Sequence, residues 1–214
     1  DSTRALTSGN PLGAVGFLSH FNPTRHIYTA IAKENGDSLL GCVIHTPGET
    51  FARLLYLAPT SLLTHPGLPP LIENLSAEAG TWGAFHVVAE VDETSEAFAA
   101  LRLSGFAAYA RQRLWNVSSI TGAGNRFAWT RAQSADLPAI QSLYHQIVPP
   151  LLHPVEPQPR NAVGWMCNEG VKCYVSVSHG AYGIVLTPLI HPEATDVSEK
   201  LSSLIGNLPD RRNR

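Results

Sequence analysis

Two side chains near the middle of the sequence, Glu90 and Tyr109, have the chemistry to move protons. Glu90 shares one face of an expected strand with His86, and either side chain can take a proton from an amine. A carboxylate at a strand end is also commonly solvated or paired, so this structural role stays open for Glu90. Tyr109 shares a face of the next expected strand with Arg111 and Arg113, whose positive charge favours loss of the phenol proton. The alternative role of Tyr109 is that of an aromatic partner in a cross-strand pair.

Composition and charge argue against nucleic acid and membranes as partners. The chain of 214 residues has a formal net charge of −2, which gives no general attraction to polyanions. Three arginines within residues 211–214 are the exception, and a solvated chain end explains them as well. The sequence has no signal peptide and no apolar run near the ~20 residues that span a bilayer, so we expect a soluble cytoplasmic protein. Because the sequence begins at Asp1 without methionine, we expect that its start is processed, trimmed or missing.

Metal and disulfide chemistry find no support in the residue spacing. The cysteines, Cys42, Cys167 and Cys173, are too few for a disulfide framework, and the segment CNEGVKC matches no usual zinc pair. We therefore expect buried, reduced thiols. The nine histidines show no His-x-x-x-His or similar spacing, so no metal site is predicted.

The first half of the sequence alternates strand and helix patterns. Apolar alternation on both sides of the Asn35-Gly36 turn predicts a hairpin, which a further strand extends to an antiparallel meander. The stretch PPLIENLSAEAG places its apolar residues on one helical stripe that Gly80 is expected to end, and a second helix is expected to stop at Gly105. The expected elements are a helix at 11–20, strands at 26–32, 38–45 and 51–57, a helix at 69–80, a strand at 84–91, a helix at 95–104 and a strand at 106–115.

A linker of small residues, SSITGAGN at 118–125, separates this block from a second one in which the order begins again. We therefore expect two domains, 1–120 and 121–214. Ser134 is expected to cap the first helix of the second domain. The other expected elements are a strand at 127–132, a helix at 137–147, a Pro-rich loop at 149–159, strands at 172–179 and 182–190, and a helix at 197–205.

The order of elements over residues 26–117, a meander, helix, strand, helix ending in Gly-Phe, then strand, resembles the GNAT N-acetyltransferase superfamily. RAQSADLPAIQSLY at 131–144 is similar to the Arg-x-x-x-x-Asp start of such domains, so the second block resembles the opening of another copy. The resemblance implies an α/β (α+β) fold, a mixed central sheet flanked by helices, in two tandem copies of which the second is truncated. The unfinished sheet of the second copy is expected to leave an open edge, through which a homo-oligomer can form.

In that superfamily acetyl-CoA lies in a splay between two adjacent strands, and its pyrophosphate sits on backbone N–H groups at a helix N-terminus. The resemblance places the phosphate loops at PTSLLTHPG, residues 59–67, and at PEATDVSEK, residues 192–200. Prolines in and after the first loop remove backbone donors, and acidic residues in the second repel phosphate. We therefore expect acetyl-CoA binding to be absent or weaker than ~0.1 mM. The resemblance implies four residues in contact with the cofactor: Leu55, Leu57, Thr60 and Gly67.

The resemblance also implies transfer of an acyl group from acyl-CoA to an amine, either a small molecule or a protein N-terminus or lysine. The family often has a tyrosine as general acid toward the departing thiolate where this sequence has Leu101. Tyr109 is the nearest residue able to replace it, with Glu90 as the base. Three functions remain open: an acyltransferase with one modified cofactor site, a GNAT-like protein that binds a ligand or partner without chemistry, and a structural copy that supports a catalytic copy completed outside this sequence.

Overall fold

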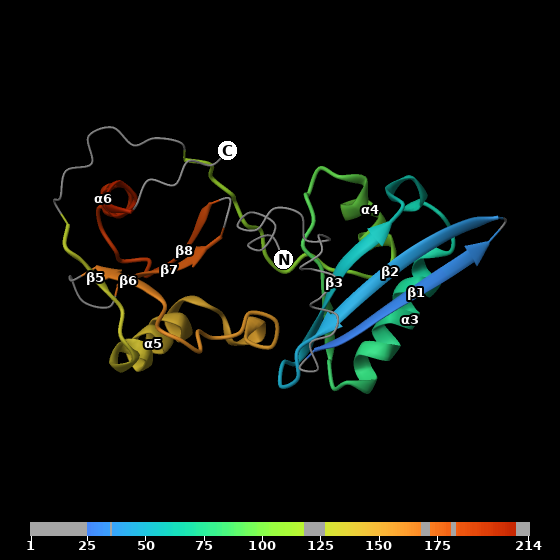
Figure 1. Ribbon diagram of the computed structural model, residues 1–214, viewed down its shortest axis with the longest axis horizontal. Helices are drawn as coiled ribbons and strands as arrows, with labels where there is room; N and C mark the ends of the chain where they lie inside the picture. Colours follow the sequence, from blue (N-terminus) through green and yellow to red (C-terminus); the bar gives the residue numbers. More distant parts are fainter. Residues whose placement is uncertain (1–24, 35, 118–126, 168–171, 181–182, 209–214) are drawn as a thin grey trace. The chain divides into compact units, whose positions relative to one another are not determined.

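The computed structural model describes residues 25–34, 36–117, 127–167, 172–180 and 183–208. The chain divides into two compact units, with the division between Arg111 and Gln112. Each unit holds one four-stranded sheet with helices (Figure 1), so the expected mixed α+β architecture is confirmed. The domain boundary expected at 120/121 and the helix expected at 11–20 both lie outside the described residues.

Unit 1 is built on a sheet with the strand order β1-β2-β3-β4. The first three strands form the expected antiparallel meander, and β4 joins β3 in parallel. The turn between β1 and β2 is tight, with Gly36 at φ 90°, a conformation that glycine adopts without a steric penalty. The strands are β1 (His26–Glu34), β2 (Asp37–His45), β3 (Phe51–Ala58) and β4 (His86–Val88).

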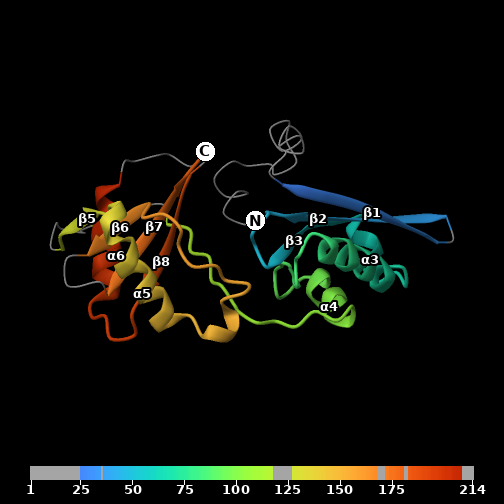
Figure 2. The ribbon, with the colours of Figure 1, turned by 90° about the horizontal axis from the view of Figure 1, so that it is seen from below.

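Two helices, α3 (Leu68–Thr81) and α4 (Glu96–Leu103), cover the same face of this sheet (Figure 2). At Gly41 of β2 a Cβ atom would lie only 2.6 Å from Cδ1 of Leu75 in α3, so the glycine permits close packing. The end expected for α3 at Gly80 is wrong, because the helix runs through Thr81 and the chain turns at Gly83, with φ 89°. The predicted stripe of α3 is buried as expected: Leu71, Ile72, Leu75 and Ala79.

The C-terminal end of α4 follows the predicted signal at Gly105, whereas its N-cap, Ser95, was not predicted. The Oγ atom of Ser95 accepts a hydrogen bond from the N–H of Phe98 at 3.4 Å, which caps the helix N-terminus. Gly105 has φ 96° and ends the helix in a Schellman motif, in which the N–H of Phe106 donates to the carbonyl of Leu101 at 3.0 Å. The local sequence therefore specifies both ends of α4.

The strand expected at 106–115 is wrong, because residues 106–117 form no strand or helix. Their apolar side chains are largely exposed, Leu114 by 67% and Trp115 by 80%. The strand expected at 84–91 is also shorter than predicted, since β4 covers only His86–Val88. β4 has only three residues, so its edge can pair with few residues of another strand. The alternating pattern of 106–115 is therefore not sufficient to form a strand beside it.

Unit 2 has the strand order β5-β6-β7-β8, with every neighbouring pair antiparallel. Its helices α5 (Leu137–Ile147) and α6 (Val197–Asn207) lie on opposite faces of the sheet (Figures 1 and 2). The sequence analysis did not predict β6. The strands are β5 (Trp129–Arg131), β6 (Gly164–Cys167), β7 (Cys173–His179) and β8 (Ile184–Ile190).

Helix ends in unit 2 differ from the prediction at two places. Ser134 is the first residue of a short 3-10 helix, η3 (Ser134–Asp136), and caps nothing. The capping box is instead formed by Gln133 and Asp136, because the Asp136 carboxylate accepts the Gln133 N–H at 2.8 Å. α6 continues through Gly206 to Asn207, since a single glycine lowers helix stability without ending a helix.

Both units contain three antiparallel strands followed by a helix, β1-β2-β3-α3 in one and β6-β7-β8-α6 in the other. This shared order supports the tandem interpretation, which stays a prediction. Among the described residues, no helix has the length and apolar character needed to cross a bilayer. In the same part of the chain, no three or more His, Cys, Asp or Glu side chains are grouped so that they could hold a metal ion. All three cysteines are free and buried, as expected.

Candidate functional site

The candidate site in unit 1 begins where β3 and β4 separate. The two strands pair in parallel over three residues only, Phe51–Arg53 against His86–Val88. β3 then continues to Ala58, and among the described residues the stretch Leu54–Ala58 has no strand partner on the β4 side. Backbone N–H and C=O groups on such an edge can hydrogen-bond to an extended ligand.

A bulge lies at the start of this open edge. Cys42 pairs with Tyr56 and Val43 with Leu54, so Leu55 is an extra residue in β3. Bulges occur often beside active sites, because they redirect a side chain and interrupt strand pairing. The Leu55 side chain is 39% exposed, which makes it accessible to a ligand on this edge.

The other three residues expected to contact a cofactor lie at and beyond the end of this edge. Leu57 is half-buried in β3 and packs against the core. Thr60 is exposed and begins a short 3-10 helix, η2 (Thr60–Leu62). Gly67 is buried at the N-cap of α3. The first two expected residues, Leu55 and Leu57, therefore share the open strand, and Thr60 and Gly67 belong to the connection that leads to α3.

The N-terminus of α3 is closed to phosphate. Helix N-termini bind anions through N–H groups that lack intrahelical partners. Here the N–H of Gly67 donates to Nδ1 of His65 at 3.1 Å, and the N–H of Leu68 donates to the His65 carbonyl at 3.0 Å. The next two residues, Pro69 and Pro70, have no N–H. From Gly67 to Pro70, all described in the structure, no backbone donor remains for a ligand.

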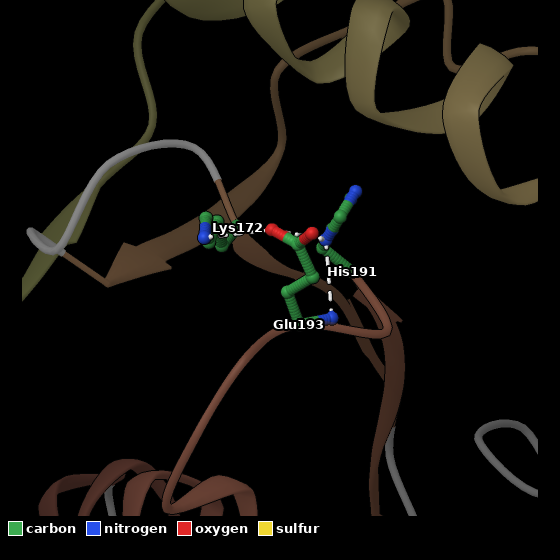
Figure 3. Close-up of polar contacts among 3 residues, drawn as sticks. All are labelled: Lys172, His191 and Glu193. Atoms are coloured by element: carbon green, nitrogen blue, oxygen red, sulfur yellow. Dashed lines mark hydrogen bonds and ion pairs between the residues drawn. The ribbon is translucent and has the colours of Figure 1, made fainter.

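The corresponding connection in unit 2, from β8 to α6, carries a carboxylate (Figure 3). Lys172 Nζ donates to Glu193 Oε2 at 3.1 Å, and the Glu193 N–H donates to Nδ1 of His191 at 3.2 Å. The hydrogen bond from Lys172, its charge and then that of His191 hold the pKa of Glu193 below its usual value. The carboxylate is therefore ionised at neutral pH, and the ammonium group of Lys172 balances its charge.

Leu101, which stands where the superfamily often has an acid, is a core residue. It is only 3% exposed and packs in the cluster formed between α3, α4 and the sheet of unit 1. Its carbonyl also accepts the Schellman hydrogen bond at the end of α4. The side chain therefore stabilises unit 1 and has no proton to donate.

Glu90 and Tyr109 lie on either side of α4 in the sequence. Glu90 is exposed two residues after β4 ends, and His86 is exposed within β4. Tyr109 is 41% exposed in the extended segment 106–117, not on a strand beside β4. Arg111 forms an ion pair with Glu93, with Arg111 Nε 3.3 Å from Glu93 Oε2, so its charge is already balanced. The positive charge of Arg111 therefore favours loss of the Tyr109 proton less than the sequence analysis expected.

Unit 2 contains an open hollow of about 410 Å³ with mainly aromatic and aliphatic walls. The indole N–H of Trp129 is already donated to the carbonyl of Lys200, at 3.0 Å. The accessible lining is about equally polar and apolar, so the hollow does not select for an apolar group. The lining residues are Phe127, Ala128, Trp129, Trp165, Leu204, Asn207 and Leu208.

The sequence analysis missed two residues that shape these sites, His65 and Lys172. His65 stands two residues before the N-cap Gly67, and a side-chain acceptor at that spacing is a local signal that can be found in a sequence. Lys172 lies 21 residues before its partner Glu193. The pairing of β7 with β8 brings the two together, so no local pattern indicates the contact.

No family model matches the chain, and no curated protein matches it. A crystal structure of a mutant of TTHA1254 from Thermus thermophilus aligns with 54% of this chain and 92% of its own, at 19% identity and a TM-score of 0.34. A likeness at that TM-score carries no argument about the fold or the activity of this chain.

Proposed function

We propose that unit 1 is a GNAT-like acyltransferase module that takes the pantetheine arm of an acyl-CoA along the open edge of β3. The observation that carries this proposal is the end of β3–β4 pairing at Arg53, followed directly by the bulge at Leu55. Pantetheine is an extended chain with two amides, and amides pair with exposed strand N–H and C=O groups. Leu54–Ala58 supplies such groups over a length of five residues.

The acyl transfer needs one group to accept a proton and one to donate a proton. In this proposal Glu90, or His86 on β4, takes a proton from the attacking amine. The amine nitrogen bonds to the thioester carbonyl carbon, the carbon–sulfur bond breaks, and the thiolate leaves. Tyr109 then gives its phenol proton to the sulfur. The acceptor is an amine, either on a small molecule or at a protein N-terminus or lysine.

The phosphate end of the acyl-CoA is held weakly in this proposal. The closed N-terminus of α3 supplies no backbone donor between Gly67 and Pro70. Each charge-assisted hydrogen bond to a phosphate contributes about 1.5–3 kcal/mol, so losing such bonds costs about tenfold or more in affinity for each. Most of the binding free energy then comes from the pantetheine arm.

Calorimetry with two ligands tests this arrangement. Acetyl-CoA and S-acetyl-pantetheine share the arm, and the second lacks the pyrophosphate and nucleotide. We expect their affinities to agree within about tenfold, because the phosphates find few partners. Leu55→Glu places a charge on the open edge and should abolish binding of both ligands. Ile31→Glu is the matched control, since Ile31 is 53% exposed on β1, at the other edge of the sheet.

Three results would contradict the proposal. A preference of about a hundredfold or more for acetyl-CoA places the binding free energy in the phosphates. Equal loss of binding in both glutamate variants means that Leu55 has no special position. Absence of binding by either ligand, together with absence of turnover of any acyl-CoA, removes the acyltransferase function altogether.

A second candidate function is a GNAT-like module that binds a ligand without chemistry. The observation that favours it is the closed N-terminus of α3, together with the buried Leu101 where the resemblance places an acid. The hollow of unit 2 then offers a second place for part of a ligand. Binding of S-acetyl-pantetheine without transfer to any amine decides for this function. Transfer that depends on Tyr109 decides for the first.

A further inference from the structure

Cys167 and Cys173 stand at the paired ends of β6 and β7. Trp165 lies opposite Val175 and Met166 opposite Tyr174, so the next pair in this register is Cys167 and Cys173. Residues directly opposite each other in an antiparallel pair have Cα atoms about 4.5–5.5 Å apart. Disulfides span Cα distances of about 4.4–6.8 Å, so the backbone already has the spacing that a disulfide needs.

The two sulfur atoms lie on the same face of the sheet. Tyr174 and Met166 pack with Ile140 of α5, and successive residues of a strand point to opposite faces. Cys167 and Cys173 therefore both point away from α5, toward the face that carries α6. The charge of Lys200 from α6 acts on the Cys173 thiol, in agreement with this direction.

An electrostatic effect supports the closeness of the two thiols. Burial, followed by the neighbouring Cys167, raises the pKa of Cys173 to about 11. Cys167 is 4% exposed and Cys173 is 2% exposed. The thiol of Cys173 is therefore protonated at neutral pH, which slows thiol–disulfide exchange. Both cysteines are free in the structure.

We propose that Cys167 and Cys173 are a cross-strand dithiol, a redox modification site that oxidises to a disulfide tying the end of β6 to the start of β7. The oxidant is a low-molecular-weight disulfide such as oxidised glutathione. One cysteine thiolate attacks it, forms a mixed disulfide and releases one glutathione thiolate. The second cysteine displaces the other glutathione, so the protein forms one S–S bond while two electrons and two protons reduce the oxidant to two thiols.

Cys42 provides an internal control in the same chain. It is buried in β2, as the other two cysteines are buried in unit 2. Its strand neighbours are Thr29 on β1 and Tyr56 on β3, and neither contains sulfur. Burial alone predicts the same behaviour for all three thiols, whereas the cross-strand geometry predicts a bond only between Cys167 and Cys173.

Intact-mass and peptide mapping of the full chain test the proposal. We expect incubation with excess oxidised glutathione to lower the mass of most of the protein by that of two hydrogens. Trypsin cleaves after Lys172, between the two cysteines, so the bond must appear as peptide 161–172 joined to peptide 173–200. Cys42 must still react with an alkylating reagent after denaturation. Reduction with dithiothreitol must restore the starting mass.

Two variants complete the experiment. Cys42→Ser should oxidise as the wild type does, and Cys173→Ser should lose the intramolecular bond. The proposal is overturned if Cys167 and Cys173 are both recovered as alkylated thiols, as stable glutathione adducts or as links between two chains. The linked peptides come from the wild type, so this decision does not depend on the folding of any variant.

Discussion

The two units place a helix after a three-stranded meander, and the connection that closes the N-terminus of α3 in unit 1 differs from the connection to α6 in unit 2. In unit 1 the closure is made by the backbone and one imidazole, because His65 takes two N–H groups and Pro69 and Pro70 have none. In unit 2 the connection carries an ion pair instead, because Glu193 is held ionised between Lys172 and His191. Unit 1 thus lacks backbone donors for a phosphate between Gly67 and Pro70, whereas unit 2 has a balanced ion pair before α6.

The two units also differ in the features that could bind a ligand. Unit 1 keeps an open strand edge with a bulge beside its closed helix, so an extended ligand still finds hydrogen-bond partners there. In unit 2 the last strand, β8, is followed by the charged connection, and the hollow of the unit lies among aromatic residues instead. The proposed binding of a pantetheine arm therefore fits unit 1 better than unit 2.

The largest expected effect concerns the helices that follow the two meanders. Leu75 of α3 and Leu204 of α6 are each 1% exposed. Leu75 packs in a closed cluster, whereas Leu204 lines an open hollow that has space to relax. We expect Leu75→Ala to destabilise unit 1 by about 4 kcal/mol and Leu204→Ala to destabilise unit 2 by about 2 kcal/mol, because the cost rises with the cavity left behind.

Native-state hydrogen exchange of peptides from α3 and α6 measures both effects in the full chain. Leu103→Ala on α4 is the control, since that side chain is 86% exposed and its removal should change stability by less than about 0.5 kcal/mol. A larger loss of protection for Leu204→Ala than for Leu75→Ala would show that the hollow side of α6 is the better packed one.

Elements set by local signals could be predicted from the sequence. The turn at Gly36 and the helix end at Gly105 depend on residues within a few positions, and both are confirmed. The stripe of α3 is confirmed for the same reason. The N-cap at Ser95 was not predicted, because the helix was expected to begin at that residue. The helix ends predicted at Gly80 and Gly206 are wrong. Each glycine has helical neighbours on both sides, and their stability outweighs the free-energy cost of one glycine in a helix.

Features that depend on distant partners could not be predicted. The alternating pattern of 106–115 suits a strand, but strand formation needs an edge, and β4 offers only three residues. β6 went unpredicted because it is four residues long and follows a Pro-rich loop. The end of β3–β4 pairing at Arg53 and the bulge at Leu55 became visible only with the registers of the strands.

Replacing two prolines can restore the backbone donors that are missing at the N-terminus of α3. The double variant Pro69→Ala, Pro70→Ala restores two N–H groups in the first turn of α3, where intrahelical partners are lacking. We expect acetyl-CoA to gain about tenfold in affinity relative to S-acetyl-pantetheine for each donor that meets a phosphate. Calorimetry with both ligands measures the ratio.

Pro47→Ala is the matched control for this gain. Pro47 lies in the turn between β2 and β3, at the end of β3 opposite to the α3 connection, so its replacement adds an N–H away from the site. An unchanged ligand ratio in the double variant would mean that prolines are not what closes this helix. Glu193→Gln in unit 2 should have no effect on the ratio, because it removes a charge without adding a donor to unit 1.

The smallest expected effect is a change of carboxyl pKa with salt at Asp92 of unit 1 and Glu193 of unit 2, whose pKa values are both lowered. Hydrogen bonds from the Thr94 hydroxyl and then its backbone N–H lower the pKa of Asp92, whereas a hydrogen bond and charge from Lys172 lower that of Glu193. Each carboxylate therefore stabilises its unit above the ordinary values, 3.8 for Asp92 and 4.5 for Glu193, and this stabilisation is lost as the pH falls through the lowered pKa.

Salt should separate these two causes in a carboxyl NMR titration. At about 1 M salt the screening length falls to ~3 Å, so the exposed ion pair weakens while the hydrogen bonds from Thr94 persist. We expect the pKa of Glu193 to rise toward its usual value and that of Asp92 to stay low. Lys172→Met should raise the pKa of Glu193, as salt does, and leave the pKa of Asp92 unchanged. Thr94→Val should raise the pKa of Asp92 and leave the pKa of Glu193 unchanged. A pKa of Glu193 that stays low at high salt, as that of Asp92 is expected to do, would mean that Lys172 acts on Glu193 through the hydrogen bond alone and not through its charge.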